Sequence, residues 1–443
     1  MDGHGTDTKR PRPSLGEYFR ASLLLGVVGF GGGLSVLASI RTAVVTRKRW
    51  LTEKEFGNTI TVAQMLPGGA AANALAYIGL RFGGMRGAFL GYVGFVLPGF
   101  IAVMVLAFAY VNYGASPDVE TLLGGFNAAV VGIIGAITLK MAQTAVSRLW
   151  QMGLAAMALL FSTLGGAAPG EIVLLSIAIG LAVDLGTKRV RHHAIFERRR
   201  EPRPGEEQPV VLPEEATTLA TSRPPPPPPP PPETSRPPPA QETPKPPVKL
   251  HATLLPLLVA AAALHITHLD RDLVQLFLSF FRTGLGAYGG GFAIIPHLKS
   301  VVARQGWLTD RQFADAVAIG KLTPGPVLLL ATFIGYLRAG WVGAIVATVA
   351  IFSAPFALVT LAGSWLDRLR SRRAVRAALR GLTPAVLGLM AAAMISLFPT
   401  MDDSSEIAIA VAVGLTLTRF EVNPVVMLAL GGLARFAFSF LGK

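Results

Sequence analysis

One sequence pattern occurs twice in this chain, in three matching blocks. The blocks are FGGGLSVLASI (30–40) with YGGGFAIIPHL (288–298), WLTEKEFGNTITVAQMLPGG (50–69) with WLTDRQFADAVAIGKLTPGP (307–326), and YIGLRFGGMRGA (77–88) with FIGYLRAGWVGA (333–344). The copies stay about 257 positions apart, so one unit has been duplicated. In membrane proteins such repeats usually place a binding site between the two copies, near the bilayer midplane, which makes a carrier the first hypothesis.

The composition is typical of an integral membrane protein. The mean hydropathy is +0.51 and only 15% of residues are charged, and apolar stretches near twenty residues long recur along the chain. The chain has no cysteine, which excludes disulfides and thiolate metal sites. Its polar beginning, MDGHGTDTKRPRPS, predicts no cleaved signal peptide. The net charge of +14 sits in loops and a central linker, as the positive-inside rule expects, so we predict no nucleic-acid partner.

The chain is predicted to have five parts. The linker carries nine consecutive prolines, 224–232, and proline favours an extended polyproline II conformation, so we expect a tether of roughly 28 Å. Docking of a partner on the prolines is the alternative. The predicted parts are a cytoplasmic tail (1–13), a first transporter repeat (14–186), a basic, proline-rich cytoplasmic linker (187–250), an inverting transmembrane helix (251–267) and a second transporter repeat (268–443).

Loop charges predict how the first repeat crosses the membrane. The basic loop 41–50 and the region of Arg81 and Arg86 belong inside, whereas the acidic loop 113–120 belongs outside. Two segments, 14–40 and 52–80, then begin and end on the same side. The predicted spanning helices that follow them are 87–112, 122–145, 150–166 and 169–186.

The two segments that do not cross are each broken at the centre, the first by the glycines from position 29 to 33 and the second by Pro67, Gly68 and Gly69. Glycine permits a strained turn and proline ends a helix, so both segments are predicted to be re-entrant hairpins. Broken backbone at membrane depth is tolerated where it is buried in protein or lines a wet cavity. The alternative is a kinked spanning helix that packs closely through its glycines.

The second repeat is predicted to have the same parts in the opposite orientation. Its most basic loop, 367–380, corresponds to the acidic loop 113–120 of the first repeat, and the additional helix 251–267 accounts for the inversion. The fold class is therefore an all-α polytopic membrane protein with two inverted repeats, each with two re-entrant hairpins and about four spanning helices. The second repeat's broken segments are 273–298 and 311–336, and its predicted spans are 341–364, 381–399, 404–418 and 424–440.

The breaks supply the chemistry that an anion needs. Helix N-termini offer unpaired amides and a positive dipole end, and glycine leaves those amides accessible. Lys321 is the most informative side chain, because an ammonium within a membrane is costly and marks function by default; a lysine that reaches to the interface is the alternative. The predicted substrate-binding residues are Gly31, Gly32, Gly33, Gln64, Pro67, Gly68, Gly69, Asn73, Gly289, Gly290, Gly291, Lys321, Thr323, Pro324 and Gly325.

Other polar positions carry less weight. Asn127 and Thr383 occupy equivalent places in the repeats and either line the path or bond between helices. Glu55, Asp315 and His297 are proton-relay candidates near predicted interfaces, where solvated roles are expected, as for Asp184 at a helix end. The spans contain no paired carboxylates, no metalloprotease motif and no nucleophile–base arrangement, and the glycine runs lack a phosphate-loop signature. We therefore expect no enzyme activity, no cofactor and no metal.

The paired motifs resemble the chromate ion transporter family in its long, two-domain form. The resemblance rests on the two glycine-rich blocks, on WLT followed by LPGG or TPGP, and on ATFIGYLRAGWVGA, and it covers roughly 14–145 and 273–399. It implies a carrier that exports chromate from the bacterial cytoplasm, coupled to the proton gradient, and an origin by fusion of two oppositely oriented units. The first copy departs from the family's Pro-Gly-Pro turn with Gly69, Lys321 replaces an uncharged residue, and Leu330 stands where the first copy has Asn73. These departures leave the identity of the anion open.

The sequence thus predicts a multi-pass protein of the bacterial inner membrane that carries a tetrahedral divalent oxyanion by alternating access and confers chromate resistance. Its expected partners are chromate or sulfate, protons and the lipid bilayer, with a homodimer as one option for assembly. The alternatives are a sulfate carrier that accepts chromate by mimicry, a gated anion channel whose hairpins form a filter, and a membrane sensor that signals through the proline linker.

Overall fold

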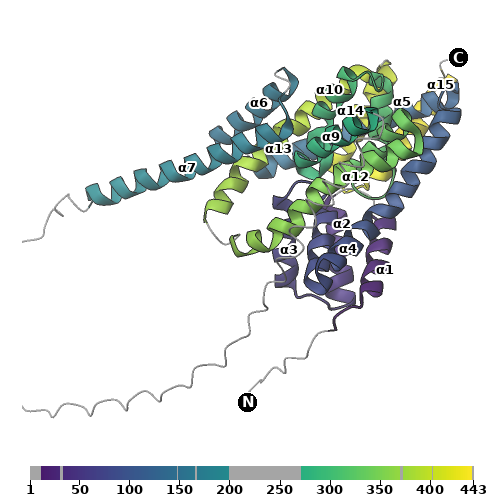
Figure 1. Cartoon of the computed structure of the whole chain (residues 1–443). Helices are drawn as coiled ribbons and strands as arrows, with labels where there is room; N and C mark the ends of the chain where they lie inside the picture. Colours follow the sequence, from purple (N-terminus) through teal and green to yellow (C-terminus); the bar gives the residue numbers. More distant parts are fainter. Residues whose placement is uncertain are drawn as a thin grey trace, which may run out of the picture. The chain divides into compact units, whose positions relative to one another are not determined.

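The computed structural model describes residues 11–29, 33–146, 148–164, 167–198, 271–369, 373–401 and 403–441. Every regular element in these ranges is a helix, as predicted for an all-α protein. The described residues up to 185 and from 271 onward belong to one compact unit, which contains both repeats (Figure 1). The predicted helix 251–267 and most of the linker lie outside the described residues.

Within the described ranges, the two repeats contribute the same succession of seven α-helices, with short 3-10 or π-helices inserted at different places. The first consists of α1 (Leu15–Val27), α2 (Gly33–Arg41), the π-helix η1 (Thr42–Arg47), α3 (Glu53–Met65), α4 (Ala70–Tyr113), α5 (Pro117–Ala145), α6 (Leu149–Thr163) and α7 (Pro169–Arg198). The second consists of α9 (Arg271–Leu285), the 3-10 helix η2 (Gly289–Ile294), α10 (Ile295–Arg304), α11 (Asp310–Leu322), the 3-10 helix η3 (Val327–Leu329), α12 (Leu330–Leu369), α13 (Arg373–Leu397), the 3-10 helix η4 (Phe398–Thr400), α14 (Ser404–Arg419) and α15 (Pro424–Leu441).

Helices α3 and α11 begin in the same way in the two repeats. Thr52 caps α3 in a capping box with Glu55, and Thr309 caps α11 in a capping box with Gln312. Such a box satisfies two amide donors that a helix start otherwise leaves unpaired. The WLT motif is therefore a helix-start signal that positions the following turn, Pro67-Gly68 in one copy and Pro324-Gly325 in the other.

Helices α4 and α12 are each two helices joined by a sharp reversal. A straight helix of 44 residues, the length of α4, would be about 66 Å long, more than twice the hydrocarbon core. Gly83 and Gly84 instead leave the helical conformation, and a Cβ on Gly79 would collide with the carbonyl of Gly87, which a straight helix would hold about 12 Å away. The chain therefore folds back on itself at this point, between the predicted segment 52–80 and the predicted span 87–112.

The second repeat reverses in the same manner. Ala339 and Gly340 have backbone angles within 10° of those at Gly83 and Gly84, and Gly335 packs against Gly343 as Gly79 packs against Gly87. Gly340 and Gly84 share φ = 58°, a left-handed conformation that glycine adopts without strain. The duplication seen in the sequence is therefore also a duplication of backbone conformation.

Four helices in the described part of the chain are long and apolar enough to cross a membrane: 70–113, 117–143, 327–363 and 377–400. They agree with four of the eight predicted spans. The other four predicted spans are also helices, α6, α7, α14 and α15, but they do not meet this standard of length and apolarity. A multi-pass membrane protein is supported, while the number of crossings stays a prediction.

The helices of the two repeats interdigitate, so that helices of one repeat pack directly on helices of the other. Helix α5 of the first repeat packs on α14 and α15 of the second, and α13 of the second packs on α6 of the first. Small residues allow the close approach: Gly132 contacts the carbonyl of Ala410, and Gly388 contacts that of Ala155. The core of the unit is thus an interface between repeats, built from equivalent positions on both sides.

The arms before these helices differ in burial. Nine consecutive residues of α11, from Phe313 to Lys321, are buried, whereas in α3 only Phe56, Thr59, Val62 and Ala63 are. The difference in burial follows from the neighbours: α11 packs on α12 and α5 and also contacts α4, α10, α15, η3 and η4, whereas α3 packs on α4 and α12. Figure 1 shows α1, α2 and α3 gathered in the lower part of this unit and α9 and α10 in its upper part.

Candidate functional site

The two Pro-Gly turns and the two glycine-rich segments meet at the interface between the repeats. The amide of Gly68 donates a hydrogen bond to the carbonyl of Ala287 (2.7 Å), and the amide of Gly325 donates one to the carbonyl of Gly29 (3.1 Å). Gly68 and Gly325 are equivalent in the two copies, and so are Ala287 and Gly29. The turn of each repeat is therefore bonded to the residue just before the glycine run of the other.

The turns also contact one another directly. A Cβ added to Gly69 would lie 3.1 Å from Cβ of Pro326, so the ends of the two turns are in van der Waals contact. Gly68 and Gly325 have φ of 104° and 106°, which side chains with a Cβ rarely adopt. Around Gly68 the space is closed, since an added Cβ would lie 2.6 Å from Cβ of Pro355 on α12. Glycine is thus required at position 68 both by the backbone angle and by the packing.

Each turn is followed by a helix start without a side-chain cap. Gly69 caps α4 with no side-chain hydrogen bond, and Pro326 does the same for η3, which continues into α12. The first amides of a helix have no partner within the helix and form its positive dipole end. Two such ends lie in contact at Gly69 and Pro326, and Pro67, Gly68 and Gly69 are buried. The arrangement concentrates unpaired amide donors where the repeats meet.

The glycine-rich runs flank this junction. Gly33 is the first residue of α2, and Gly31 and Gly32 lie outside the described residues. Gly289, Gly290 and Gly291 open the 3-10 helix η2, whose start also lacks a side-chain cap. Gly291 has φ = 94° and packs against Val327 and Leu328, directly after the second Pro-Gly turn.

Lys321 is buried beside the second turn. Its side chain is in the last turn of α11, where the negative end of the helix dipole favours a cation, and only 6% of the residue is exposed. Its Nζ lies 4.6 Å from the centre of the Phe292 ring, which provides a cation–π contact. Among the residues that the structure describes, no group forms a hydrogen bond or an ion pair with it. The ammonium therefore has the capacity to bind an anion at this place.

The predicted neutral donors are placed differently from Lys321. Gln64, its equivalent in the first repeat, is exposed. Asn73 is fully buried and uses its amide nitrogen on the carbonyls at the end of α3, with Pro67 at 2.9 Å and Ala63 at 3.2 Å, which leaves its Oδ1 without a partner. Thr323 donates to the carbonyls of Ile319 or Gly320. In this conformation Asn73 and Thr323 hold the turns rather than offer free donors.

The expectation that Asp315 is solvated is wrong. It lies near the start of α11, but only 3% of it is exposed, and its carboxylate accepts hydrogen bonds from Tyr110 on α4 (2.9 Å) and Asn127 on α5 (2.8 Å). Sequence reasoning named Asp315 and Asn127 separately and missed Tyr110. An acid within the apolar run of α11 was the available signal. Its partners lie 188 and 205 residues away in the chain, and a single sequence carries no signal for such distant contacts.

Three other polar positions have mixed outcomes. Asp184 was also expected to be solvated, yet its side chain is only 10% exposed and pairs with Arg380 at 3.1 Å. Glu55 is partly exposed, completes the capping box with Thr52 and pairs with Arg81. His297 is partly buried. Among the described residues no group of three or more His, Cys, Asp or Glu could hold a metal ion.

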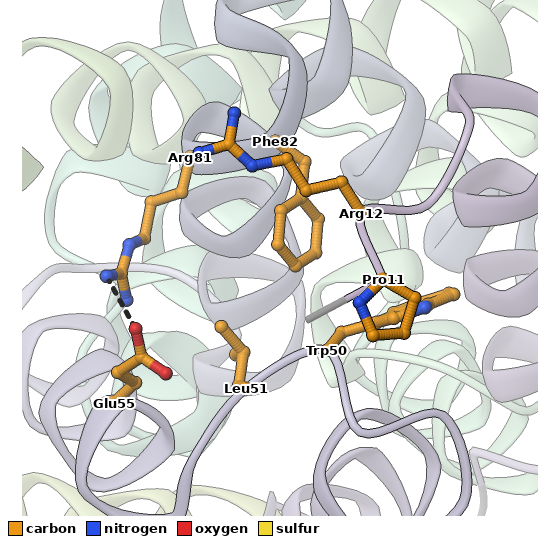
Figure 2. Close-up of a pocket in the computed structure, with 7 residues that line it drawn as sticks. All are labelled: Pro11, Arg12, Trp50, Leu51, Glu55, Arg81 and Phe82. Carbon is orange, nitrogen blue, oxygen red and sulfur yellow. Dashed lines mark hydrogen bonds and ion pairs between the residues drawn. The ribbon is translucent and has the colours of Figure 1, made fainter. Parts of the chain in front are cut away.

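A cavity of about 640 Å³ lies at the other end of α3 from the turn. It is lined by Pro11, Arg12, Trp50, Leu51, Glu55, Arg81 and Phe82, and Figure 2 shows Arg81 reaching Glu55 (3.3 Å) in this cavity. Glu55 is in the first turn of α3 and Met65 ends the helix ten residues later, a rise of about 15 Å. The cavity is thus distinct from the junction of turns, and its two arginines make it a candidate entrance rather than the binding site.

Comparison with known proteins gives a consistent result. The family model described as chromate transporter matches residues 16–183 and 274–436, that is, both repeats. A chromate transport protein of Cupriavidus metallidurans is 30% identical over 392 residues, covering 87% of this chain and 83% of its own length. A probable chromate transport protein of Synechococcus elongatus is 29% identical over 391 residues, covering 87% of this chain and 85% of its own length.

A shorter relative resembles one repeat alone. An uncharacterized transporter of Bacillus subtilis is 30% identical over 164 residues, which is 36% of this chain but 83% of that protein. A single unit therefore exists as a separate chain, in agreement with the duplication. No solved structure matches this chain.

Proposed function

The chain belongs to the chromate transporter family, and from this premise we propose that it is a secondary carrier that exports chromate from the bacterial cytoplasm by alternating access and confers chromate resistance. The observation that carries the proposal is the reciprocal junction of the repeats. Equivalent Pro-Gly turns and glycine-rich segments from both copies meet there, next to a buried ammonium without a described polar partner. A binding site between duplicated units is where carriers of this type hold their substrate.

The proposed site binds the dianion through backbone amides and one cation. The uncapped starts after Gly69 and Pro326 supply amide donors and a positive dipole end. Lys321 supplies a charge-assisted contact, which is about twice as strong as a neutral hydrogen bond. The start of η2, which has no side-chain cap, provides further amides from the glycine run 289–291. The remaining predicted residues, Gln64, Asn73 and Thr323, stay proposals as ligands; the bonds of Asn73 and Thr323 would have to rearrange first.

The lengths of the helical arms support re-entrant segments. Helices α1, α3 and α11 have 15 residues or fewer, about 20 Å, whereas a crossing helix needs about twenty residues. Asn73 of α4 bonds the carbonyl of Ala63 in α3, so these two arms run back along each other from the turn. We place the turns near the bilayer midplane of the inner membrane, with the repeats in opposite orientation.

The unequal burial of α3 and α11 supports alternating access. The exposed positions of α3, Glu53, Lys54, Gly57, Thr61 and Gln64, are mostly polar, so this face suits an aqueous path, while the equivalent arm α11 is closed against α5. Exchange of these two environments between the repeats would open the other side. In the exchanged state Asn58 of α3 would approach Thr383 of α13, as Asp315 approaches Asn127 here.

The entrance cavity fits this direction of transport. Arg12 and Arg81 line it, and loop charges place Arg81 on the cytoplasmic side. Exposed arginines raise the local concentration of a dianion without holding it tightly. We propose that chromate enters from this side and that protons move in the opposite direction.

The test is flux of radiolabelled chromate into everted membrane vesicles, in which export appears as uptake. The proposal expects saturable uptake that depends on this protein and collapses with an uncoupler. Uptake that rises linearly with chromate and ignores the uncoupler would favour a channel. A sulfate carrier that accepts chromate by mimicry is the second candidate, because the two anions share charge and shape; sulfate competing at lower concentration than chromate would select it.

A further inference from the structure

Asp315 is the acid that links α11 of the second repeat to two helices of the first. Its Oδ2 accepts a hydrogen bond from the Tyr110 hydroxyl at 2.9 Å, and its Oδ1 accepts one from Asn127 Nδ2 at 2.8 Å. Both donors come from the other repeat, on α4 and α5. Each carboxylate oxygen therefore helps to hold α11 in its buried position.

The charges around Asp315 come from the elements packed against it. Arg311 lies one turn before it on the same face of α11, and its Nη2 donates to the carbonyl of Glu120 at the start of α5. Further along, Glu406 on α14 pairs with Arg435 on α15. Arg311 and Glu120 face Asp315 with opposite charges, so neither fixes its protonation state alone.

Asn127 can accompany either protonation state of Asp315. Its Oδ1 is buried and has no hydrogen-bond partner, while its Nδ2 donates to the ionised carboxylate. A half-turn of the amide would present Oδ1 instead, and a protonated Asp315 could donate its O–H to it. A buried acceptor without a partner is costly, and this one lies beside a carboxylate, which turns from acceptor into donor when it is protonated.

We propose that Asp315 is the proton-binding residue of this carrier, and that its hydrogen bonds with Tyr110 and Asn127 change when it is protonated. The inference rests on the proposed function, and it names Asp315 as the residue that binds the coupling proton. The step is the addition of one proton to the carboxylate, which becomes a carboxylic acid and loses its negative charge; the proton leaves on the other side of the membrane. Protonation replaces two charge-assisted hydrogen bonds, from Tyr110 and Asn127, by weaker neutral ones, so the docked position of α11 on α4 and α5 is linked to the proton.

The first repeat has no equivalent of this group. Position 58 of α3, which corresponds to Asp315, is Asn58 and does not titrate. The proposal therefore places one proton site per chain at this pair of positions, in the arm that is buried here. It also explains why the two arms differ in chemistry although their backbones agree.

The experiment uses full-length carrier in proteoliposomes and measures two quantities with radiolabelled chromate. The first is exchange at equal chromate on both sides and no pH gradient; the second is net flux driven by an imposed pH gradient. We expect Asp315→Asn to keep exchange within about threefold and to lose gradient-driven flux about tenfold or more, because an amide cannot bind the proton. Asp118→Asn, the same change at an exposed acid of α5, is the matched control and should keep both.

The outcomes are separable. Gradient-driven flux in Asp315→Asn equal to wild type would overturn the assignment. If Asp315→Asn loses exchange as well, Asp315→Glu decides: a shifted pH dependence of gradient-driven flux supports a proton site, and an unchanged pH dependence, or no flux at normal protein level, overturns it. Absence of chromate exchange in the wild type would instead refute the proposed function itself.

Discussion

Helices α3 and α11 are copies of one arm that have come to lie in different environments. Both begin with a capping box and end at a Pro-Gly turn whose glycine has φ near 105°. Yet α11 is enclosed by other helices, and its Asp315 and Lys321 are buried in the protein. At the equivalent positions α3 has Asn58 and an exposed Gln64. The comparison separates what the duplication preserves, which is the backbone, from what has diverged, which is charge and packing.

The difference teaches where a carrier of this kind places its functional groups. Because the backbones of the two arms match, the exchange of environments that we propose between the repeats needs no new fold. The buried ionisable groups of the two arms, Asp315 and Lys321, both lie in α11, so in the proposed exchange only that arm carries buried charge.

The largest expected effect is at the shared backbone, with Gly68→Ala. The substitution combines a disfavoured φ, about 1–3 kcal/mol of strain, with a Cβ 2.6 Å from Pro355, and we expect chromate flux to fall more than about tenfold. Gly325→Ala has the same backbone strain, but its nearest contact is the end of the movable Leu329 side chain at 3.1 Å, so its loss should be smaller. Flux in everted vesicles at matched protein level measures both.

The control for this pair is Gly57→Ala, a glycine of α3 with no atom within 4 Å of an added Cβ. It should leave flux unchanged. Equal flux in Gly68→Ala and wild type would show that the turn is neither strained nor part of the site, and would remove the junction from the account.

A smaller effect on chromate transport is expected from the difference in charge between the two arms. It is tested by comparing Lys321→Ala with Gln64→Ala, the same change at the equivalent position of the first repeat. Loss of a charge-assisted contact costs about 1.5–3 kcal/mol, which corresponds to about a ten- to hundred-fold rise in half-saturating chromate. Gln64→Ala should change it by less than about twofold, because the side chain is exposed and neutral. Lys321→Arg should also bind less well than wild type, since a planar fork replaces a compact charge.

The measurement is the chromate dependence of initial flux. If Lys321→Ala keeps the wild-type half-saturation at normal protein level, Lys321 is not a ligand and the amides are the main donors. If Gln64→Ala is affected as strongly as Lys321→Ala, the two arms are functionally equivalent and the comparison fails.

The smallest expected effect is from the connection between the repeats. Deletion of residues 200–245, which lie outside the described part of the chain, should leave flux within about twofold of wild type, because a tether tolerates shortening. A large loss of flux, with the protein still inserted, would instead show that the linker acts as a signalling element.

The sequence predicted the breaks of the fold well, for a local reason. Glycine and proline act on their own backbone, so the breaks at 66–69 and 323–326, each with a Pro-Gly turn, follow from residue type. The glycine run 289–291 instead opens the 3-10 helix η2, and the interruption lies just before it, at 286–288. The capping boxes of α3 and α11 are likewise local. The reversals at Gly83-Gly84 and Ala339-Gly340 fall in the gaps that the sequence left between predicted segments.

The environment of the candidate site could not be predicted in the same way. The sequence pattern of α3 and α11 is nearly the same, and Asp315 is buried because α11 packs on helices that include α5 and α4, which supply its two donors. Asn73 was predicted as a free donor, but the turn folds its amide onto the carbonyls of α3. Which groups are partnered depends on residues far away in the chain, and a single sequence does not report them.

The account's central claim is that the two repeats exchange environments while they carry chromate. The chain has no cysteine, so Asn58→Cys with Thr383→Cys introduces one defined pair, joining α3 to α13 in the exchanged state. We predict that oxidation during chromate turnover forms this disulfide, stops chromate flux and is reversed by a reductant. Full chromate flux through the cross-linked protein would contradict the account.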